Sequence, residues 1–546
     1  MLTKEQIAII SSTGDIKINA VAGSGKTTTL IEYAKARPAQ KILYLAFNKA
    51  VKLEAEKKFA EKGVSNVKIE TAHSLAFSHV VKGTTYTIKK EGSYKTPEIV
   101  EILGLGNFSG RHTEYILATH INAFVSYFCN SARSRVQELN YEEVVIDAAA
   151  KQFAINFKEE ISHQTRLFLD KMNKGEIPII HDFYLKLFQL ARPVLSYTTI
   201  LFDEGQDASE AMLDLFLSQP ATKVIVGDTH QQIYGWRYAV NSLEKVNYPS
   251  YNLSASFRFN NEIAELARDV IHWKQYLKGA PAITITGLGK PGKIQSRAVI
   301  ARTNAGLLVK AIELLIEKKE IGSVYFEGRI ENYTYANEGA SIYDVLNLYS
   351  DEKDRIRDKM IGSMKDMDEL EEYIENTGDA SLRMLVEVVK EYGKKIPGYI
   401  KMLKESHLDH NEKDKADMIF STVHRCKGME YDEVTLADDF ITEKKLVDLV
   451  GGEEEVNTAR LAEEINLLYV AVTRTKSDLY VSETIFPDAG KETPLKNIRV
   501  LKAAEKKYGH KKELPAKTTK TTYVYDKSPG RAARPPRDRS VKRRRS

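Results

Sequence analysis

The chain has 546 residues, enough for roughly two to four domains, and 42% of them are hydrophobic, which suffices for ordinary cores. Its formal net charge is only +5, but residues 501–546 hold 16 Lys and Arg against four Asp and Glu, so the rest of the chain is net acidic. No stretch approaches the ~20 apolar residues of a membrane helix. The two cysteines, Cys129 and Cys426, exclude a disulfide framework and fit a reducing compartment.

Short runs rich in β-branched and aromatic residues alternate with longer helical stretches along most of the chain. This alternation is typical of parallel sheets covered by helices and predicts an α/β fold. Residues 73–165 and 331–416 interrupt the alternation with mainly helical patterns, so we interpret both as insertions. The predicted strands are residues 16–21, 42–46, 199–203, 223–227, 298–302 and 433–437.

A phosphate-binding loop follows the first predicted strand. Residues 20–27 read AVAGSGKT, and a helical run comes next. Glycines let backbone N–H groups curl around a phosphate at a helix N-terminus, while Lys26 adds positive charge and Thr27 offers a hydroxyl to Mg²⁺. Because strand, loop and helix occur in the required order, a P-loop is favoured over a chance glycine-rich turn. The expected nucleotide contacts are Ala22, Gly23, Ser24, Gly25, Lys26, Thr27 and Thr28.

Paired carboxylates end the predicted strand at residues 199–203. Asp203 and Glu204 follow a run of apolar-leaning residues. A P-loop enzyme needs such a strand end, with Asp203 holding Mg²⁺ and Glu204 acting as general base for the attacking water. An acidic pair at a strand end is common on protein surfaces, so this interpretation depends on the P-loop upstream.

Further motifs resemble those of superfamily 1 DNA helicases of the UvrD/Rep branch, in the family's order over residues 3–480. Residues 203–207 read DEGQD and are similar to the family's DEAQD box. The other matching segments are the Q motif (3–6), motif Ia (47–50), the TxHS box (71–74), motif III (227–237), motif IV (256–258), motif V (422–430) and motif VI (464–474). Within the branch, the chain looks most similar to F-box DNA helicases and related phage and bacterial enzymes, although no F-box is evident.

The resemblance implies an α/β fold of two RecA-like P-loop domains, each with a mainly helical insertion. Few large apolar residues in the C-terminal segment predict a disordered tail, either a genuine basic arm or an artificial extension. The expected parts are domain 1A (1–72 and 166–250), insertion 1B (73–165), domain 2A (251–330 and 417–500), a small insertion 2B (331–416) and the basic tail (501–546).

The resemblance also implies that both domains form the ATP site. Gln6 would read the adenine edge, Phe257 would stack on adenine and Glu430 would accept a ribose hydroxyl. Arg258 and Arg474 would act as arginine fingers from domain 2A, whereas a lone arginine is more often part of a surface salt bridge. The expected catalytic residues are Lys26, Asp203, Glu204, Gln231, Arg258 and Arg474, with Thr27 and Asp203 binding the Mg²⁺ that accompanies ATP.

Single-stranded DNA is the track that the resemblance implies. Trp236 would stack on a base, and although core packing is the commoner fate of tryptophan, its flanks favour an exposed platform. The branch usually has an aromatic residue two positions before the Asn of motif Ia. Here that position is Ala46 and Phe47 follows it, which leaves the role of Phe47 open. The expected DNA contacts are Asn48, His73, Tyr234, Trp236, Arg237, Thr422 and His424.

The expected function is an ATP-dependent 3′–5′ DNA helicase or translocase. Its partners would be single-stranded DNA and 3′-tailed or forked duplex DNA, in repair, recombination or replication, with the protein acting as a monomer and without a membrane. Two alternatives stay open: a translocase that strips proteins from DNA and unwinds weakly, and a nucleotide-regulated DNA-binding module. The expected compartment is a bacterial or phage-infected cytoplasm, or the nucleus of a eukaryote.

Overall fold

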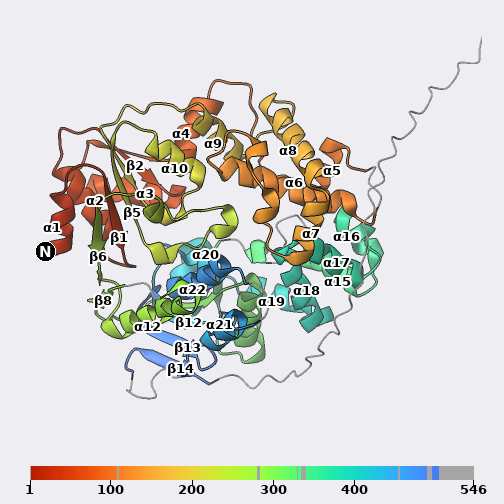
Figure 1. Ribbon diagram of the computed structural model, residues 1–546. Helices are drawn as coiled ribbons and strands as arrows, with labels where there is room; N and C mark the ends of the chain where they lie inside the picture. The colour runs from red at the N-terminus through yellow and green to blue at the C-terminus, as the bar shows by residue number, and fades with distance from the viewer. Residues whose placement is uncertain are drawn as a thin grey trace, which may run out of the picture.

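The computed structural model describes residues 2–90, 92–106, 110–279, 283–328, 330–333, 340–452, 456–487 and 495–502 (Figure 1). It contains two six-stranded parallel sheets flanked by helices, which confirms the predicted α/β class. The predicted disordered tail lies outside the described residues, apart from residues 501 and 502. Within the described part of the chain, no helix combines the length and apolar character that crossing a bilayer requires.

The first sheet has the strand order β3-β2-β4-β5-β1-β6, with every pair parallel. Its strands are β1 (Ile16–Ala20), β2 (Ile42–Ala46), β3 (Val67–Thr71), β4 (Thr199–Phe202), β5 (Thr222–Gly227) and β6 (Ser250–Leu253). The four inner strands correspond to predicted ones, whereas the two edge strands were not predicted. The residues after β1, β4 and β5 meet at the carboxyl edge, where ligands bind in open α/β sheets.

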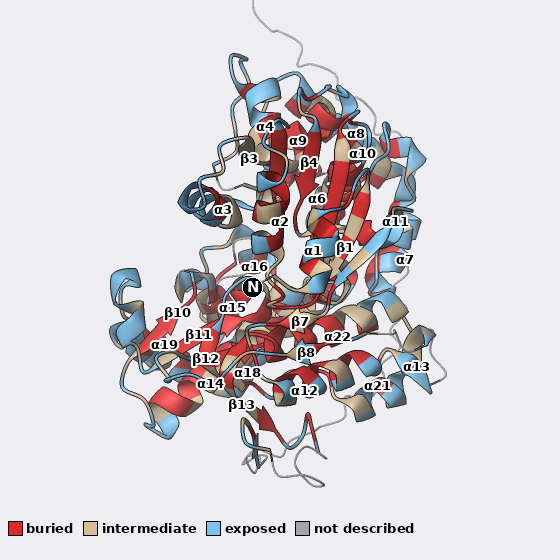
Figure 2. Ribbon diagram, turned by 90° about the vertical axis from the view of Figure 1, so that its left-hand side faces the viewer, coloured by how far each residue is buried: buried red, intermediate tan, exposed pale blue. Residues whose placement is uncertain are grey.

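The second sheet has the order β10-β11-β9-β12-β13-β14 and is also parallel throughout. Its strands are β9 (Arg297–Ala301), β10 (Val324–Phe326), β11 (Met418–Thr422), β12 (Tyr431–Leu436), β13 (Thr475–Ser482) and β14 (Ile498–Leu501). A separate two-stranded sheet pairs β7 (Ala255–Ser256) with β8 (Thr286–Gly287). The two large sheets lie in the upper and lower parts of Figure 2, and their strands are mostly buried.

Helices follow the strands of both sheets. With the first sheet are α1 (Lys4–Ile10), α2 (Lys26–Lys35), α3 (Lys49–Glu61), α10 (Glu210–Leu217) and α11 (Ser242–Lys245). With the second are α12 (Asn261–His272), α13 (Gln275–Lys278), α14 (Asn304–Ile312), α20 (Val423–Cys426), α21 (Glu443–Val450) and α22 (Thr458–Val472). All five residues of β2 are buried, which explains why such strands read as continuous apolar runs instead of alternating ones.

Two helical groups account for the interruptions in the sequence pattern. The first contains α4 (Ala72–Ala76), α5 (Thr96–Leu103), α6 (Thr113–Asn130), α7 (Ala148–Asn156), α8 (Lys158–Asn173) and α9 (His181–Leu190). The second contains α15 (Ile342–Tyr349), α16 (Lys359–Ser363), α17 (Met367–Thr377), α18 (Ala380–Tyr392) and α19 (Ile396–Glu405). The domain limits stay predictions, but the one between residues 165 and 166 falls inside α8, so the helical group continues beyond it.

The two helical groups pack against each other. Helix α17 contacts both α6 and α7, and Figure 1 shows α15–α18 beside α5–α7. His120 Nε2 lies 3.1 Å from the backbone oxygen of Asn376, and the hydroxyls of Thr119 and Tyr373 are 3.0 Å apart. One apolar core runs through both groups and reaches one face of each large sheet. This core connects the two sheets through the helical groups.

Candidate functional site

The P-loop connects β1 to α2 at the carboxyl edge of the first sheet, and Lys26, Thr27 and Thr28 begin the helix. Gly23 and Gly25 have φ angles of 72° and 79°, which glycine adopts without strain. The Ser24 hydroxyl is buried and has no hydrogen-bond partner within the described residues. A buried hydroxyl of this kind at a helix N-terminus fits a phosphate oxygen.

Carboxylates surround the Lys26 ammonium group. Its Nζ atom lies 2.5 Å from Oε1 of Glu204. Burial would lower the pKa of Lys26, but the charges of Glu204, Asp203 and Asp228 outweigh it and raise this pKa. Asp203 accepts a hydrogen bond from the Tyr44 hydroxyl, and burial together with the charge of Glu204 raises its pKa. The site therefore concentrates negative charge around Lys26.

The donor set at this edge fits Mg²⁺ bound with phosphate and water. Within the described residues, no group of three or more His, Cys, Asp or Glu side chains could hold an ion by itself. Mg²⁺ in ATP-hydrolysing enzymes takes one or two protein oxygens and completes its shell with phosphates and waters. Asp203, directly after β4, and Thr27, in the first turn of α2, could supply those two oxygens, since both follow strands that end at the same edge of the sheet.

A chain of hydrogen bonds leads from Glu204 to the second half of the protein. Gln206 Nε2 lies 2.6 Å from Oε2 of Glu204 and 3.1 Å from Oδ2 of Asp207. Asp207 forms a buried ion pair with Lys427. Burial raises the pKa of Asp207 to about 6, although Lys427 opposes the shift. Burial would also raise the pKa of Glu204, but Lys26 and Lys427 lower it to about 2.

The raised pKa of Asp207 predicts a specific pH dependence of stability. Between pH 3.8 and about 6 the folded state holds a proton on Asp207 that the unfolded state lacks, so this carboxyl lowers the free energy of unfolding as the pH rises. From pH 5 to pH 7, Asp207→Asn should gain about 1 kcal/mol relative to the wild type. Urea unfolding of both proteins at each pH measures this, and a difference that does not change with pH would contradict it.

Two glutamines flank the P-loop. Gln6 is buried, accepts a hydrogen bond from the backbone N–H of Thr3 at 2.9 Å and donates to Oγ1 of Thr29 at 3.1 Å. Gln231 donates from Nε2 to Oδ2 of Asp228 at 2.8 Å. Both amides are therefore held in defined orientations, Gln6 near the start of α2 and Gln231 beside the carboxylates.

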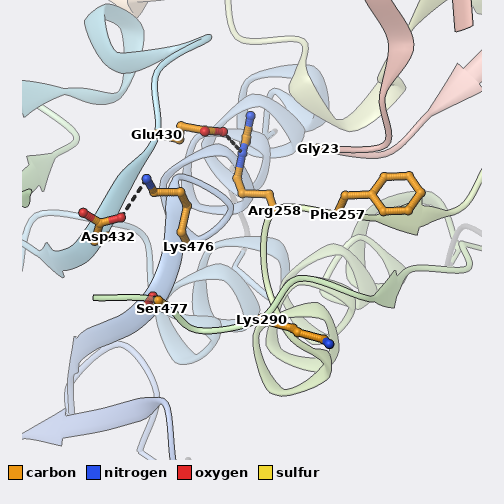
Figure 3. Close-up of a pocket in the computed structure, with 9 residues that line it drawn as sticks. Gly23, Phe257, Arg258, Lys290, Glu430, Asp432, Lys476 and Ser477 are labelled. Atoms are coloured by element: carbon orange, nitrogen blue, oxygen red, sulfur yellow. Dashed lines mark hydrogen bonds and ion pairs between the residues drawn. The ribbon is translucent and has the colours of Figure 1, made fainter. Parts of the chain in front are cut away.

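A cavity of about 380 Å³ separates the P-loop from the second sheet (Figure 3). Gly23 contributes from the P-loop side, and a Cβ atom on it would come within 2.6 Å of Cβ of Arg258. Figure 3 shows Arg258 directed toward Glu430, with 2.9 Å between Nε and Oε2. The Phe257 ring is 47% exposed, which leaves a face for stacking. The remaining lining residues were not predicted: Lys290, Gly292, Asp432, Lys476 and Ser477.

The two predicted arginine fingers differ in their surroundings. Arg258 pairs with Glu430 and also donates to the backbone oxygen of Thr473 at 2.9 Å. Arg474 is 1% exposed and donates to the backbone oxygens of Val470 at 3.0 Å and Met429 at 3.3 Å. Burial and the nearby charge of Arg258 lower the pKa of Arg474 to about 10. Arg474 is therefore not part of a surface salt bridge, which was the alternative to its role as an arginine finger.

Aromatic rings form a row between the two sheets. Phe47, directly after β2, stacks on Tyr234 with 5.5 Å between ring centroids. Trp236 lies 6.5 Å from Tyr234 and 6.3 Å from His424, and Arg237 lies 5.0 Å above its ring. Trp236 is 60% exposed, as its flanks predicted, whereas Trp273 is in the core. The row presents flat surfaces of the kind on which bases stack.

The other residues predicted to contact DNA have partners within the protein. Asn48 is the N-cap of α3, and His73 Nε2 lies 3.5 Å from Oδ1 of Asp182. Thr422 is buried at the end of β11. His424 Nε2 lies 3.0 Å from the backbone oxygen of Ile233, and burial lowers the pKa of His424 to about 4. Near neutral pH, His424 therefore carries no positive charge, and its contact with DNA stays a prediction.

Residues 84–485 match the family described as the UvrD-like helicase C-terminal domain. The chain belongs to the UvrD-like helicases. It is 30% identical over 514 residues to F-box DNA helicase 1 of Gallus gallus, covering 89% of this chain and 49% of that protein. It is 28% identical over 524 residues to F-box DNA helicase protein 1 of Schizosaccharomyces pombe, covering 89% of this chain and 58% of that protein. The chain thus spans about half the length of these relatives.

In this UvrD-like helicase, the residues predicted to form the ATP site are brought together from both halves of the protein. Their roles stay predictions. Lys427 was not predicted, although it lies within motif V, because its partner Asp207 is more than 200 positions away. Lys290 and Lys476 lie outside every recognised motif, so nothing in the sequence indicated that they line the cavity. Cys426, also in motif V, is fully buried and packs in the apolar core beside the second sheet.

Proposed function

We propose that this UvrD-like helicase is an ATP-dependent DNA helicase that moves 3′ to 5′ on single-stranded DNA. The observation that carries the proposal is the cavity between the P-loop and the second sheet, where Gly23 faces Phe257, Arg258 and Glu430. A nucleotide bound there would contact both sheets, so its hydrolysis would change how they sit against each other. Such a site can convert ATP hydrolysis into movement of one half of the protein relative to the other, as a motor requires.

The residues around Lys26 support a defined order of events. An ATP phosphate would compete with Glu204 for the Lys26 ammonium group, now 2.5 Å from that carboxylate. Separation from Lys26 removes a charge that lowers the pKa of Glu204, and therefore makes Glu204 a stronger base for the attacking water. Mg²⁺, held by Asp203 and Thr27, would offset charge on the phosphates. Gln231, fixed by Asp228, would orient the water.

Arg258, just after β7, and Arg474, directly before β13, would complete the site from the predicted domain 2A. Arg258 pairs with Glu430 beside the cavity, and a γ-phosphate would draw its guanidinium away from that carboxylate. Glu430 would then be free to accept a ribose hydroxyl, and Phe257 would stack on the adenine. Because Arg474 comes directly before β13 of the second sheet and Lys26 follows β1 of the first, the site would be complete only when the two sheets are close together.

Unwinding of tailed duplexes tests the proposal. With ATP and Mg²⁺, the protein should separate a duplex with a 3′ single-stranded tail and leave a 5′-tailed duplex intact. Unwinding of only the 5′-tailed substrate would contradict the polarity. Displacement of streptavidin from a 5′-biotinylated oligonucleotide without unwinding would favour the protein-stripping translocase, and DNA binding without ATP turnover would favour the nucleotide-regulated module.

The setting of the activity is also proposed. Forked and 3′-tailed DNA would be the substrates, acted on by a monomer in repair, recombination or replication. Both relatives named above come from eukaryotes, which supports the nuclear alternative among the predicted compartments.

Trp236 provides the largest exposed ring of the aromatic row, so its removal should weaken DNA binding. Trp236→Ala should cost about 1–3 kcal/mol of binding free energy, because base stacking on one aromatic residue contributes that much. Anisotropy of a labelled oligothymidine gives the dissociation constants. Phe216→Leu, in the core near β4, is a control for general loosening of the fold and should leave DNA affinity unchanged. Equal DNA affinities of Trp236→Ala and the wild type would show that Trp236 does not contribute to DNA binding.

A further inference from the structure

One side of α22 follows the motif III segment (residues 227–237) almost from end to end. The contacts come from three residues of the helix spaced three apart, so they lie on one side of it. The helix and the segment run in opposite directions. The hydrogen bonds join Tyr469 to Asp228 Oδ2 (3.0 Å), Asn466 to the backbone oxygen of Gln232 (2.8 Å), and the backbone N–H of Gly235 to Glu463 Oε1 (3.1 Å).

The ends of this arrangement touch the two proposed sites. Tyr469 bonds the same Asp228 oxygen that orients Gln231, and its hydroxyl lies 3.5 Å from the backbone nitrogen of Ala22 in the P-loop. At the other end, Glu463 fixes the residue directly before Trp236. Six helical residues span about 9 Å. The helix thus bridges the space between the water-orienting glutamine and the exposed ring.

The middle contact is buried. Asn466 is 5% exposed and Tyr469 is fully buried, so their hydrogen bonds form away from water. A buried hydrogen bond of this kind is costly to break without a replacement, which makes the register between helix and segment well defined. A shift of α22 relative to the first sheet would consequently move the segment as a unit.

We propose that Glu463, Asn466 and Tyr469, together called the α22 strap, are positioning residues that couple the ATP site to the DNA-stacking ring. The proposal rests on the proposed function. When the second sheet moves with the nucleotide, the strap carries the motif III segment with it, so that Gln231 and Trp236 change position together. Glu463 holds the end of the strap at the DNA-stacking ring and Tyr469 the end at the ATP site, so the loss of either contact should reduce the stimulation of ATP turnover by DNA.

Gly235 provides an independent way to break the Glu463 contact. A Cβ atom at residue 235 would come within 2.5 Å of Oε2 of Glu463. The obstructing atom is the end of a flexible side chain, so Gly235→Ala should push the carboxylate aside at little cost in stability. Once Glu463 is replaced by alanine, the same methyl group has room, and Gly235→Ala should have no further effect.

The test measures oligonucleotide affinity, ATP turnover without DNA, and thermal stability for each variant. Glu463→Ala and Gly235→Ala should each weaken oligothymidine binding about tenfold, the factor for losing one hydrogen bond to a charged group, and the double variant should be no weaker than either. Their DNA-free turnover and melting temperature should match the wild type, whereas the stimulation of their turnover by saturating oligothymidine should fall. Glu463→Gln keeps an acceptor oxygen and should restore affinity. Tyr469→Phe should show the opposite pattern, with lower turnover and unchanged affinity.

Arg460→Ala is the matched control, because Arg460 is an exposed residue in the first turn of α22 and lies outside the strap. It should leave affinity and turnover unchanged. Additive effects of Glu463→Ala and Gly235→Ala, or affinity, turnover and stability falling together, would overturn the proposal. A wild-type protein without DNA-stimulated turnover would instead contradict the proposed function, so the two failures are distinguishable.

Discussion

Replacing Lys26 with alanine is expected to reduce DNA-stimulated ATP turnover by about a thousandfold or more and to abolish strand separation with it. The ammonium group of Lys26 is the cation beside Glu204, Asp203 and Asp228. Without it, the negative phosphates of ATP would enter a site that holds uncompensated carboxylates. Turnover at saturating oligothymidine and unwinding of a 3′-tailed duplex measure the effect.

The matched control for this prediction lies on the same helix. Lys35, in the last turn of α2, forms only an exposed pair with Glu32 at 3.3 Å. Exposed pairs contribute about 0–1 kcal/mol, so Lys35→Ala should retain turnover and unwinding. Circular dichroism should show that Lys26→Ala is folded. Unwinding by a folded Lys26→Ala protein would rule out the P-loop as the source of the motor's energy, and with it the proposed mechanism.

The central strands could be predicted from the sequence because burial makes their composition distinctive. All of β2 and all of β4 are buried, and both read as uninterrupted apolar runs. The edge strands carry a weaker signal. In β3 only Ile69 and Thr71 are buried, and its polar residues hide the pattern. Strand β11 was hidden for another reason, since it comes directly after a helical insertion and lies beside the distant β9.

The residues of the candidate site could be predicted from the sequence where a motif consists of neighbouring residues. The P-loop needs only a strand, glycines and a helix in succession, so it could be recognised without a structure. The ion pair between Asp207 and Lys427 depends on how two sheets pack, and no local pattern encodes that distance. The same holds for the contact of Glu463 with Gly235, in which one helix meets a loop of the other sheet.

The neutral state of His424 shows a further limit of motif reasoning. The resemblance placed His424 among the expected DNA contacts, but a motif does not state the charge of the ring. The structure buries His424 against the Ile233 carbonyl and lowers its pKa to about 4. Only the packing around the ring could reveal this, because burial decides which protonation state persists.

The second large loss of ATP turnover is expected when either of the two predicted arginine fingers is replaced. Arg258→Ala and Arg474→Ala should each lower ATP turnover by about 10³-fold or more, the range for removing an arginine finger. Their effects on stability should differ. Arg258 sits beside an open cavity and pairs with the half-exposed Glu430, so Arg258→Ala should change the free energy of unfolding little.

Arg474→Ala, in contrast, should also lower the free energy of unfolding, by about 3 kcal/mol or more, because it opens a cavity and removes the hydrogen bond that Arg474 donates to the backbone oxygen of Met429. Urea unfolding separates the two variants, and turnover is compared at a temperature where both are folded. Arg474→Lys keeps a charge but lacks the planar fork, so it should recover neither property. Normal turnover in folded Arg258→Ala would exclude Arg258 as a finger, and unchanged stability in Arg474→Ala would contradict its buried position.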